Sequence, residues 1–316
     1  MQIPATSAKS TPKPMSNPAA KPVKRKVDGV LLLDKPVGLS SNIALQKTKR
    51  LFRAEKAGHT GTLDPFATGL LPLCLGEATK FSQFLLDADK EYLALVRLGV
   101  RTRSGDPEGD VISERSVNIN QSDLRQALAG FMGEIEQMPP MHSALKHGGR
   151  PLYEYARKGI EIERKARRVV VHELEIKSFA DELCALRVRT SKGFYVRALA
   201  DDLGEVLGCG AHLQGLRRTG VGPFRIEQAQ SLEELSELEE LERDRRLMPA
   251  DIMVEALAAL PLDLEATWQI CHGQPIWLPR LMVGQQYRLY APDGRFLGVG
   301  EVNQDGKVAP RRLVVT

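Results

Sequence analysis

The sequence predicts an α+β fold with a small all-β unit at its C-terminal end. Helical and strand-like patterns alternate between residue 27 and about residue 247, whereas short strands and turn signals follow residue 262. A chain of 316 residues has room for about two domains. We therefore expect a tail at residues 1–26, a larger mixed unit at residues 27–255 and a small unit at residues 262–316.

The tail is rich in Pro, Ser, Ala and Lys and lacks apolar periodicity, so we expect it to be disordered. Residues 1–26 carry six Lys or Arg and no acid, while the rest of the chain has 38 basic and 40 acidic residues. Such a tail either adds weak, salt-sensitive attraction to RNA or is inert. Its prolines disfavour the amphipathic helix of a transit peptide.

The composition disfavours several classes of protein. No apolar run approaches the roughly 20 residues that span a bilayer, and no secretory signal is visible. The four cysteines are scattered singly without a C-x-x-C pair, which disfavours a zinc site and a disulfide framework. We expect a cytoplasmic protein without a metal ion or a membrane partner.

The larger unit begins with a strand pattern at residues 27–37, closed by the turn signal Lys35-Pro36. Ser40, Ser41 and Asn42 then offer N-caps for a helix to about Arg53. Further strand patterns lie at residues 91–100, 169–179 and 183–190. Further helical patterns lie at residues 78–88, from a cap at Ser122, from Pro151, from Arg197 to about Leu207, and at residues 231–247.

The C-terminal unit has short strand patterns at residues 287–290, 295–302 and 313–315. Two Asp-Gly turn signals, at residues 293–294 and 305–306, separate them.

Charge is also uneven along the chain. Residues 141–170 carry eight Lys or Arg against three acids, which indicates either a phosphate-contacting surface or a solvated one. Residues 231–251 carry eight acids against three arginines and read as a solvated helix face.

One stretch of the larger unit is crowded with turn residues, Gly58-His-Thr-Gly-Thr-Leu-Asp-Pro65 followed by Phe-Ala-Thr-Gly69. Glycines at positions 58 and 61 let a ligand approach the main chain. Pro65 fixes its own φ and disfavours the helical region for the preceding Asp64. Asp64 is therefore presented from a shaped loop, either as a reactive carboxylate or as part of an Asx-type turn.

Residues 58–72, with Gly-Glu-Ala-Thr-Lys at residues 76–80, resemble the active-site signature of the TruB-type tRNA pseudouridine synthases. These enzymes isomerise a uridine in the TΨC arm of tRNA. The resemblance covers residues 28–225 closely and residues 262–316 less closely. It implies a mixed, largely antiparallel sheet, a C-terminal PUA-like RNA-binding domain, and monomeric action on the TΨC stem-loop at tRNA position 55.

The implied reaction breaks an N-glycosidic bond, turns the base and makes a C–C bond. It requires a carboxylate and a base out of its stack, but no metal or cofactor. The resemblance implies that Asp64 is this carboxylate, that Tyr92 packs on the target base and takes part in proton transfer, and that Arg197 keeps Asp64 ionised. From the residues alone, Tyr92 reads as a strand tyrosine and Arg197 as a surface arginine.

Four more residues match substrate-binding positions of the family. His59 would help to flip the target nucleotide, Tyr195 and Leu216 would line the uridine pocket, and Lys80 would contact phosphate. Without the resemblance, Tyr195 and Leu216 read as core residues and Lys80 as a helix-surface lysine. One position departs from the pattern, because His142 stands where the family commonly has tyrosine, and any role of that hydroxyl is in doubt here.

Three alternatives stay open at this point. One is an RNA-binding or tRNA-folding protein that has lost catalysis, which an intact set of Asp64, Tyr92 and Arg197 disfavours. The second is a synthase that acts on another RNA. The third is a different enzyme, such as a hydrolase, although no G-x-S-x-G, H-E-x-x-H, Walker A or G-x-G-x-x-G motif supports it.

Overall fold

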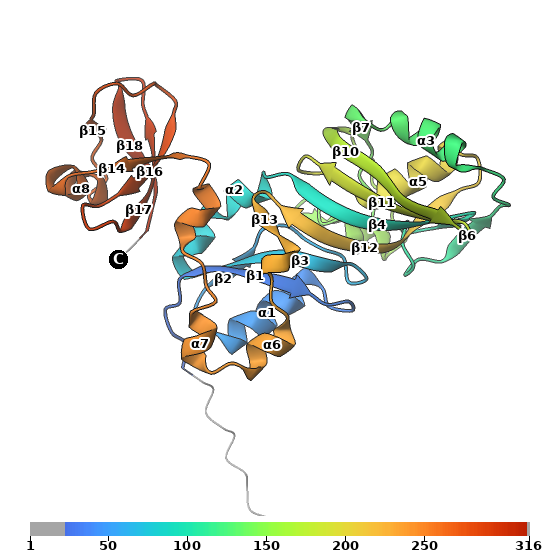
Figure 1. Cartoon of the computed structure of the whole chain (residues 1–316), viewed down its shortest axis with the longest axis horizontal. Helices are drawn as coiled ribbons and strands as arrows, with labels where there is room; N and C mark the ends of the chain where they lie inside the picture. The colour runs from blue at the N-terminus through green and yellow to red at the C-terminus, as the bar shows by residue number, and fades with distance from the viewer. Residues whose placement is uncertain (1–22, 315–316) are drawn as a thin grey trace, which may run out of the picture.

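The computed structural model describes residues 23–314, and its larger part is built on one nine-stranded sheet (Figure 1). The strand order is β1-β3-β12-β4-β11-β10-β7, with β2 paired to β3 and β13 paired to β12. The strands are β1 (Gly29–Lys35), β2 (Ala57–His59), β3 (Thr68–Leu75), β4 (Lys90–Leu98), β7 (Gly133–Gln137), β10 (Arg167–Ala180), β11 (Leu183–Thr190), β12 (Ala211–Val221) and β13 (Phe224–Arg225). Only β3 and β12 pair in parallel within this sheet, which confirms the mixed, largely antiparallel arrangement.

Helices cover this sheet in two places (Figure 1). The helices α3 (Gln121–Ala129) and α5 (Val196–Val206) pack on the β4–β11–β10 part, and α1 (Ser41–Leu51) and α6 (Leu232–Glu237) pack on β1 and β3. A third apolar cluster lies around the 3₁₀ helices η1 (Gly76–Phe81) and η3 (Ala250–Val254) and the short helix α2 (Ser82–Leu86). The apolar stripes that the sequence shows are thus divided among three cores.

The helix caps test the local predictions. Ser40 caps α1, since its side chain accepts a hydrogen bond from the backbone nitrogen of Ile43. The cap expected at Ser122 is wrong, because the N-cap is Asn120, two residues earlier, whose side chain accepts from the backbone nitrogens of Ser122 and Asp123. Asn is as good an N-cap as Ser, so the helix can begin at the earlier residue. The helical pattern at residues 231–247 resolves into α6 and α7 (Glu240–Asp244).

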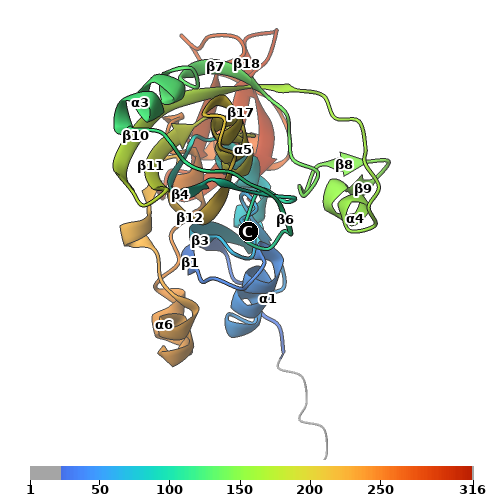
Figure 2. The ribbon, with the colours of Figure 1, turned by 90° about the vertical axis from the view of Figure 1, so that its right-hand side faces the viewer.

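Several smaller elements lie in the connections between the strands of this sheet. The hairpin of β5 (Val100–Thr102) and β6 (Val111–Glu114) follows β4, and η2 (Ile226–Gln228) follows β13. A second hairpin, β8 (Lys146–His147) and β9 (Arg150–Pro151), leads into α4 (Leu152–Ala156). This second hairpin and α4 project away from the sheet (Figure 2). Of the eight Lys and Arg at residues 141–170, Lys146 and Arg150 lie on this hairpin, and Arg157 directly follows α4.

The C-terminal unit is a curled five-stranded sheet in the order β14-β16-β17-β18-β15. Its elements are β14 (Ala258–Pro261), α8 (Leu264–Cys271), β15 (Ile276–Trp277), β16 (Gln286–Tyr290), β17 (Phe296–Val302) and β18 (Lys307–Leu313). The unit is consistent with a PUA-like domain. It also contains a helix that the strand patterns did not predict, α8, which Asp263 caps. The stretch before residue 262 contributes β14, which pairs in parallel with β16.

The predicted tail lies outside the described residues except for residues 23–26. Within these, Arg25 donates to both carboxylate oxygens of Asp244 at 2.6 Å, and its backbone nitrogen bonds the carbonyl of Arg53. Arg25 is therefore part of the fold, two residues before the expected start at Val27. None of the helices within residues 23–314 has the length and apolar character needed to cross a bilayer.

Candidate active site

A cleft of about 340 Å³ opens where the signature loop and the start of α5 meet β4 and β12. It brings together five of the seven residues that the sequence singled out, namely Asp64, Tyr92, Tyr195, Arg197 and Leu216. These residues come from a loop, two strands and a helix terminus that are far apart in the sequence. The cleft is therefore the candidate active site.

The loop that carries Asp64 is fixed through its backbone. The hydroxyl of Ser41, in the first turn of α1, accepts from the nitrogen of Leu63 at 2.7 Å and donates to the carbonyl of Leu63 at 3.0 Å. The Asp64 carbonyl accepts from the nitrogen of Ala67 at 3.1 Å, so the chain does turn here. The side chain of Asp64 has another partner, since its Oδ2 lies 3.0 Å from Nη2 of Arg197.

Arg197 is buried at the start of α5 and holds two carboxylates. Besides Asp64, its Nη1 lies 3.0 Å from Oδ2 of Asp106, which is 3% exposed. The guanidinium also donates to the carbonyls of Ser104 at 3.2 Å and His142 at 2.6 Å. Asp106 lies in the polar loop between β5 and β6. The sequence reading missed it, because a Ser-Gly-Asp loop carries no signal of the arginine it will meet.

The charge state of Asp64 depends on competing influences. Burial raises the pKa of its carboxyl, and Arg197 lowers it. Asp106 raises this pKa further, while Lys35 and His142 lower it. The ion pair with Arg197 is therefore the main influence that favours the charged form of Asp64 against burial.

Tyr92 and Arg218 face each other across the floor of the cleft. They are register partners on β4 and β12, and both line the cleft. Burial raises the pKa of Tyr92, and the positive charge of Arg218 opposes that shift. Arg218 is only 1% exposed and donates from Nε to the carbonyl of Leu70 at 2.7 Å. The sequence did not reveal Arg218, since no strand pattern was assigned to residues 211–221 and an isolated arginine usually faces solvent.

Tyr195 is held by its main chain. The buried side chain of Gln137, at the end of β7, donates to the Tyr195 carbonyl at 3.0 Å and accepts from the Tyr195 nitrogen at 2.7 Å. Burial raises the pKa of Tyr195. Leu216, on β12, adds an apolar wall to the cleft. Tyr195 and Leu216 thus suit the apolar faces of a base.

His59 and Lys80 lie apart from this group and do not line the cleft. The Nδ1 atom of His59 is buried without a hydrogen-bond partner among residues 23–314. Burial lowers the pKa of His59, and Arg218 lowers it further. Lys80 pairs with Glu77 at 2.6 Å and donates to the carbonyl of Leu313 at 2.8 Å. In this structure Lys80 therefore connects η1 to β18.

His142 borders the cleft through its link to Arg197. Its side chain is half-buried, and burial together with Arg197 lowers its pKa below the ordinary histidine value. Both influences favour the neutral imidazole. Within residues 23–314, no three His, Cys, Asp or Glu side chains are grouped so that they could hold a metal ion.

Three consecutive parts of the chain match known protein families. Residues 49–196 match "TruB family pseudouridylate synthase (N terminal domain)", residues 197–255 match "tRNA pseudouridylate synthase B C-terminal domain", and residues 258–314 match "Pseudouridine synthase II TruB, C-terminal". Proteins named tRNA pseudouridine synthase B from Methylobacillus flagellatus and Burkholderia mallei are 50% and 53% identical to this chain. The alignments cover 93% and 95% of this chain and 97% and 98% of those proteins.

Solved structures agree at lower identity. A chain in "Structure of H/ACA RNP bound to a substrate RNA containing 2'-deoxyuridine" superposes with a TM-score of 0.70 at 26% identity, covering 91% of this chain and 85% of that one. A chain in "Crystal Structure of a Cbf5-Nop10-Gar1 Complex" gives 0.69 at 28% identity, covering 91% and 84%. With the cleft, the sheet and the sequence matches in agreement, this chain belongs to the TruB family of pseudouridylate synthases.

Proposed function

We propose that this family member is a tRNA pseudouridine synthase that isomerises the uridine at position 55 in the TΨC arm, with Asp64 as the catalytic carboxylate. The observation that carries the proposal is the ion pair of 3.0 Å between Asp64 and the buried Arg197 on the wall of the cleft. The curated relatives at about 50% identity are named for tRNA, which supports that substrate.

The cleft residues divide the chemistry between them. The Asp64 carboxylate attacks the sugar or the base, or removes a sugar proton, and the bond between N1 of uracil and C1' of ribose breaks. The base turns, a bond forms between C5 and C1', and the proton on C5 is lost while N1 gains one. Tyr92, whose phenol faces the cleft, packs on the base and takes part in this proton transfer. Arg197 keeps Asp64 charged and oriented throughout.

The substrate base must leave its stack to enter the cleft, since the volume of about 340 Å³ suits one nucleotide and not a duplex. Tyr195 and Leu216 would hold the faces of the flipped uracil. His59, in β2 at the start of the signature stretch, would support flipping. The projecting hairpin and α4, with the basic stretch at residues 141–170, provide a surface for the phosphates of a stem-loop (Figure 2).

Two alternative functions have less support than this one. A synthase of another RNA is favoured by the similarity to a chain solved in an H/ACA RNP bound to a substrate RNA, but at 26% identity that similarity is more distant than the one to the curated relatives. A non-catalytic RNA-binding protein is disfavoured because Asp64, Tyr92 and Arg197 meet in one cleft. Monomeric action in the cytoplasm, as the resemblance implies, is part of the proposal.

The experiment uses tRNA transcripts labelled with tritium at C5 of uridine, because isomerisation releases this hydrogen. We expect release of about one equivalent from the unmodified transcript and none above background from a transcript with cytidine at position 55. An isolated TΨC stem-loop should also be a substrate. Equal release from the cytidine variant would move the target to another uridine. No release from any of these RNAs, despite binding, would overturn the proposed function.

A further inference from the structure

Arg218 is a buried cation whose partners within residues 23–314 do not include a carboxylate. Its pKa is lowered by burial, and among residues 23–314 the opposing influence comes from Tyr92. Within the described part of the chain, its side-chain hydrogen bonds run to the carbonyl oxygens of Leu70 and Gly61. Burying a guanidinium without a counterion opposes folding. The other arginine of the cleft, Arg197, is by contrast paired with two carboxylates.

The partners of Arg218 come from both sides of the reaction centre. Nε donates to the Leu70 carbonyl in β3 at 2.7 Å, and Nη2 donates to the Gly61 carbonyl at 3.2 Å, three residues before Asp64. On the other side, Tyr92 of β4 is the register partner of Arg218 and lines the same cleft. The side chain of Arg218 therefore extends from its pairing with Tyr92 to the loop that carries Asp64.

The backbone is arranged to bring Arg218 to this place. Gly69 lies opposite Arg218 in the parallel pair of β3 and β12, and a Cβ at Gly69 would lie 2.3 Å from the Arg218 carbonyl oxygen. On the other side, the pairing of β12 with β4 is shifted between Arg218 and Gly220. Such a bulge re-aims the neighbouring side chain.

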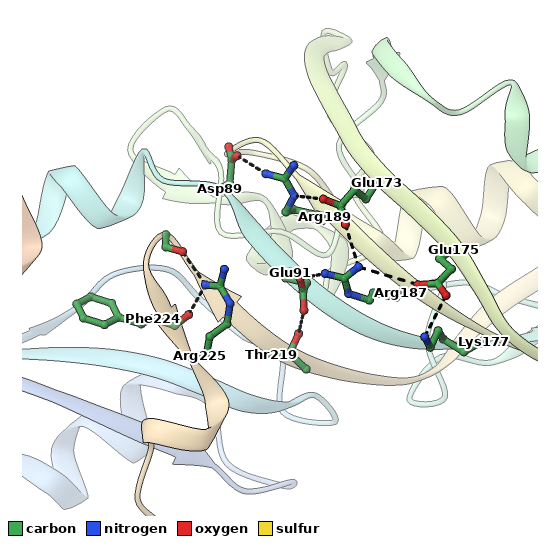
Figure 3. A network of polar contacts seen from close by, with 11 residues as sticks. Asp89, Glu91, Glu173, Glu175, Lys177, Arg187, Arg189, Thr219, Phe224 and Arg225 are labelled. Atoms are coloured by element: carbon green, nitrogen blue, oxygen red, sulfur yellow. Dashed lines mark hydrogen bonds and ion pairs between the residues drawn. The ribbon is translucent and has the colours of Figure 1, made fainter. Parts of the chain in front are cut away.

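The residue in the bulge is held from behind the sheet. Thr219 Oγ1 donates to Glu91 Oε1 at 2.8 Å, and Arg187 pairs with Glu91 Oε2 at 2.6 Å (Figure 3). Glu91 and Tyr92 are consecutive on β4 and point to opposite faces of the sheet. The same two strands are thus locked on the outer face at the point where they present Arg218 and Tyr92 to the cleft.

We propose that Arg218 is a positioning residue that acts through Tyr92. Its guanidinium holds the Tyr92 hydroxyl at a fixed place relative to Gly61 and hence to the loop of Asp64. The planar fork supplies the directions of these bonds, which a lysine at this position would not reproduce. This inference rests on the proposed function for its effect on rate, but the contact itself does not depend on that function.

The test is a double-mutant cycle of Arg218→Gln and Tyr92→Phe. Single-turnover tritium release is measured at saturating tRNA, so that a change in binding does not enter the rate. With Tyr92 present, we expect Arg218→Gln to lower the rate about 100-fold, in the range of a lost proton-transfer group. In the Tyr92→Phe background, the same change should lower the remaining rate less than about twofold.

A matched control is Arg217→Gln on the same strand, where the arginine pairs with Asp34 at 2.6 Å and is 40% exposed. Its effect should be the same whether or not the Tyr92→Phe change is also present. Equal fold-losses for Arg218→Gln in both backgrounds would overturn the positioning role and leave Arg218 as a structural residue only.

The four proteins of the cycle are also unfolded in urea, because this readout needs no activity. We expect the two changes to be coupled by about tenfold in the unfolding equilibrium constant, as for a hydrogen bond to a charged group. Additive effects on unfolding would show that the two side chains do not interact, and would overturn the inference even if the wild type were inactive. Coupled unfolding without tritium release by the wild type would count against the proposed function and leave the contact standing.

Discussion

At the scale of single residues, the cleft is organised by two buried arginines with opposite surroundings. Arg197 shares its charge between Asp64 and Asp106 and also bonds two carbonyls. Arg218 donates hydrogen bonds to the carbonyls of Leu70 and Gly61, and it lies beside Tyr92 on the neighbouring strand. The first arginine is thus suited to control a carboxylate, and the second to orient a phenol.

The pairing with Asp106 predicts an effect on catalysis. Asp106→Asn leaves the buried Arg197 with one carboxylate fewer, so the guanidinium is less firmly held against Asp64. We expect the single-turnover rate to fall by about 10- to 100-fold, equivalent to about 1.4–2.7 kcal/mol, with little change in tRNA affinity. Asp201→Asn is the control, because Asp201 pairs with Arg101 at 2.6 Å outside the cleft. Similar losses in both variants would contradict the account.

The electrostatics of Asp64 predict an acid limit to activity. Burial raises the pKa of Asp64, so the reactive carboxylate is lost, as pH falls, at a higher pH than in a free aspartate. Arg197 lowers this pKa, and its removal in Arg197→Gln should shift the acid limb of the rate profile to higher pH. Single-turnover rates across the pH range would show this shift. An acid limb that does not move would mean that another group titrates there.

At the scale of elements, α1 holds the signature loop through hydrogen bonds to the backbone of Leu63. The Ser41 hydroxyl serves both the nitrogen and the carbonyl of Leu63, in the residue directly before Asp64. Its neighbour Ser40 instead caps the helix at the surface. The two adjacent serines at the start of α1 therefore have different roles, because Ser41 fixes the loop and Ser40 caps the helix.

This division predicts different outcomes for two alanine variants. Ser41→Ala leaves a buried nitrogen and carbonyl without partners, which should lower the free energy of unfolding by about 1–3 kcal/mol and lower the catalytic rate. Ser40→Ala should cost about 0.5–2 kcal/mol of stability, as for a lost N-cap, and leave the rate unchanged. Urea unfolding and single-turnover rates separate the two. Equal rates for the two variants would refute a special role for Ser41.

The sequence predicts features whose signals lie within a few residues better than contacts between segments that are far apart in the chain. The glycines and Pro65 mark the loop, and Ser40 marks the helix start, because both signals lie within a few residues. Asp106 and Arg218 were not foreseen, since their partners come from other strands and loops. Likewise α8 was missed, because its eight residues precede the strand and turn signals from residue 287 onward on which the all-β prediction was based.

At the scale of the whole molecule, the C-terminal sheet is joined to the catalytic part through η1. The rings of Phe81 and Phe296 lie 5.3 Å apart, and Val299 of β17 belongs to the apolar cluster around η1. Lys80 adds its bond to the Leu313 carbonyl at 2.8 Å. The 3₁₀ helix η1, which contains the signature residues 76–80, therefore also contacts the C-terminal unit.

This shared cluster predicts coupled unfolding. The chain has two tryptophans, Trp268 and Trp277, and both lie in the C-terminal unit, so their fluorescence reports on that unit. In the wild type, the fluorescence and far-UV circular dichroism transitions in urea should coincide. In Phe296→Ala the fluorescence transition should come first, because the contact with Phe81 is lost. Coincident transitions in the variant would show that the unit is held by other contacts.

The most direct measurement is tritium release from labelled tRNA by the wild type and by Asp64→Asn, which keeps the shape of the side chain and removes its charge. Asp87→Asn, at a surface pair with Lys192, is the control. We expect about one equivalent from the wild type and from the control, and none from Asp64→Asn, with tRNA binding retained in all three. Full release by Asp64→Asn would leave the enzyme standing but would remove Asp64 from the centre of its mechanism.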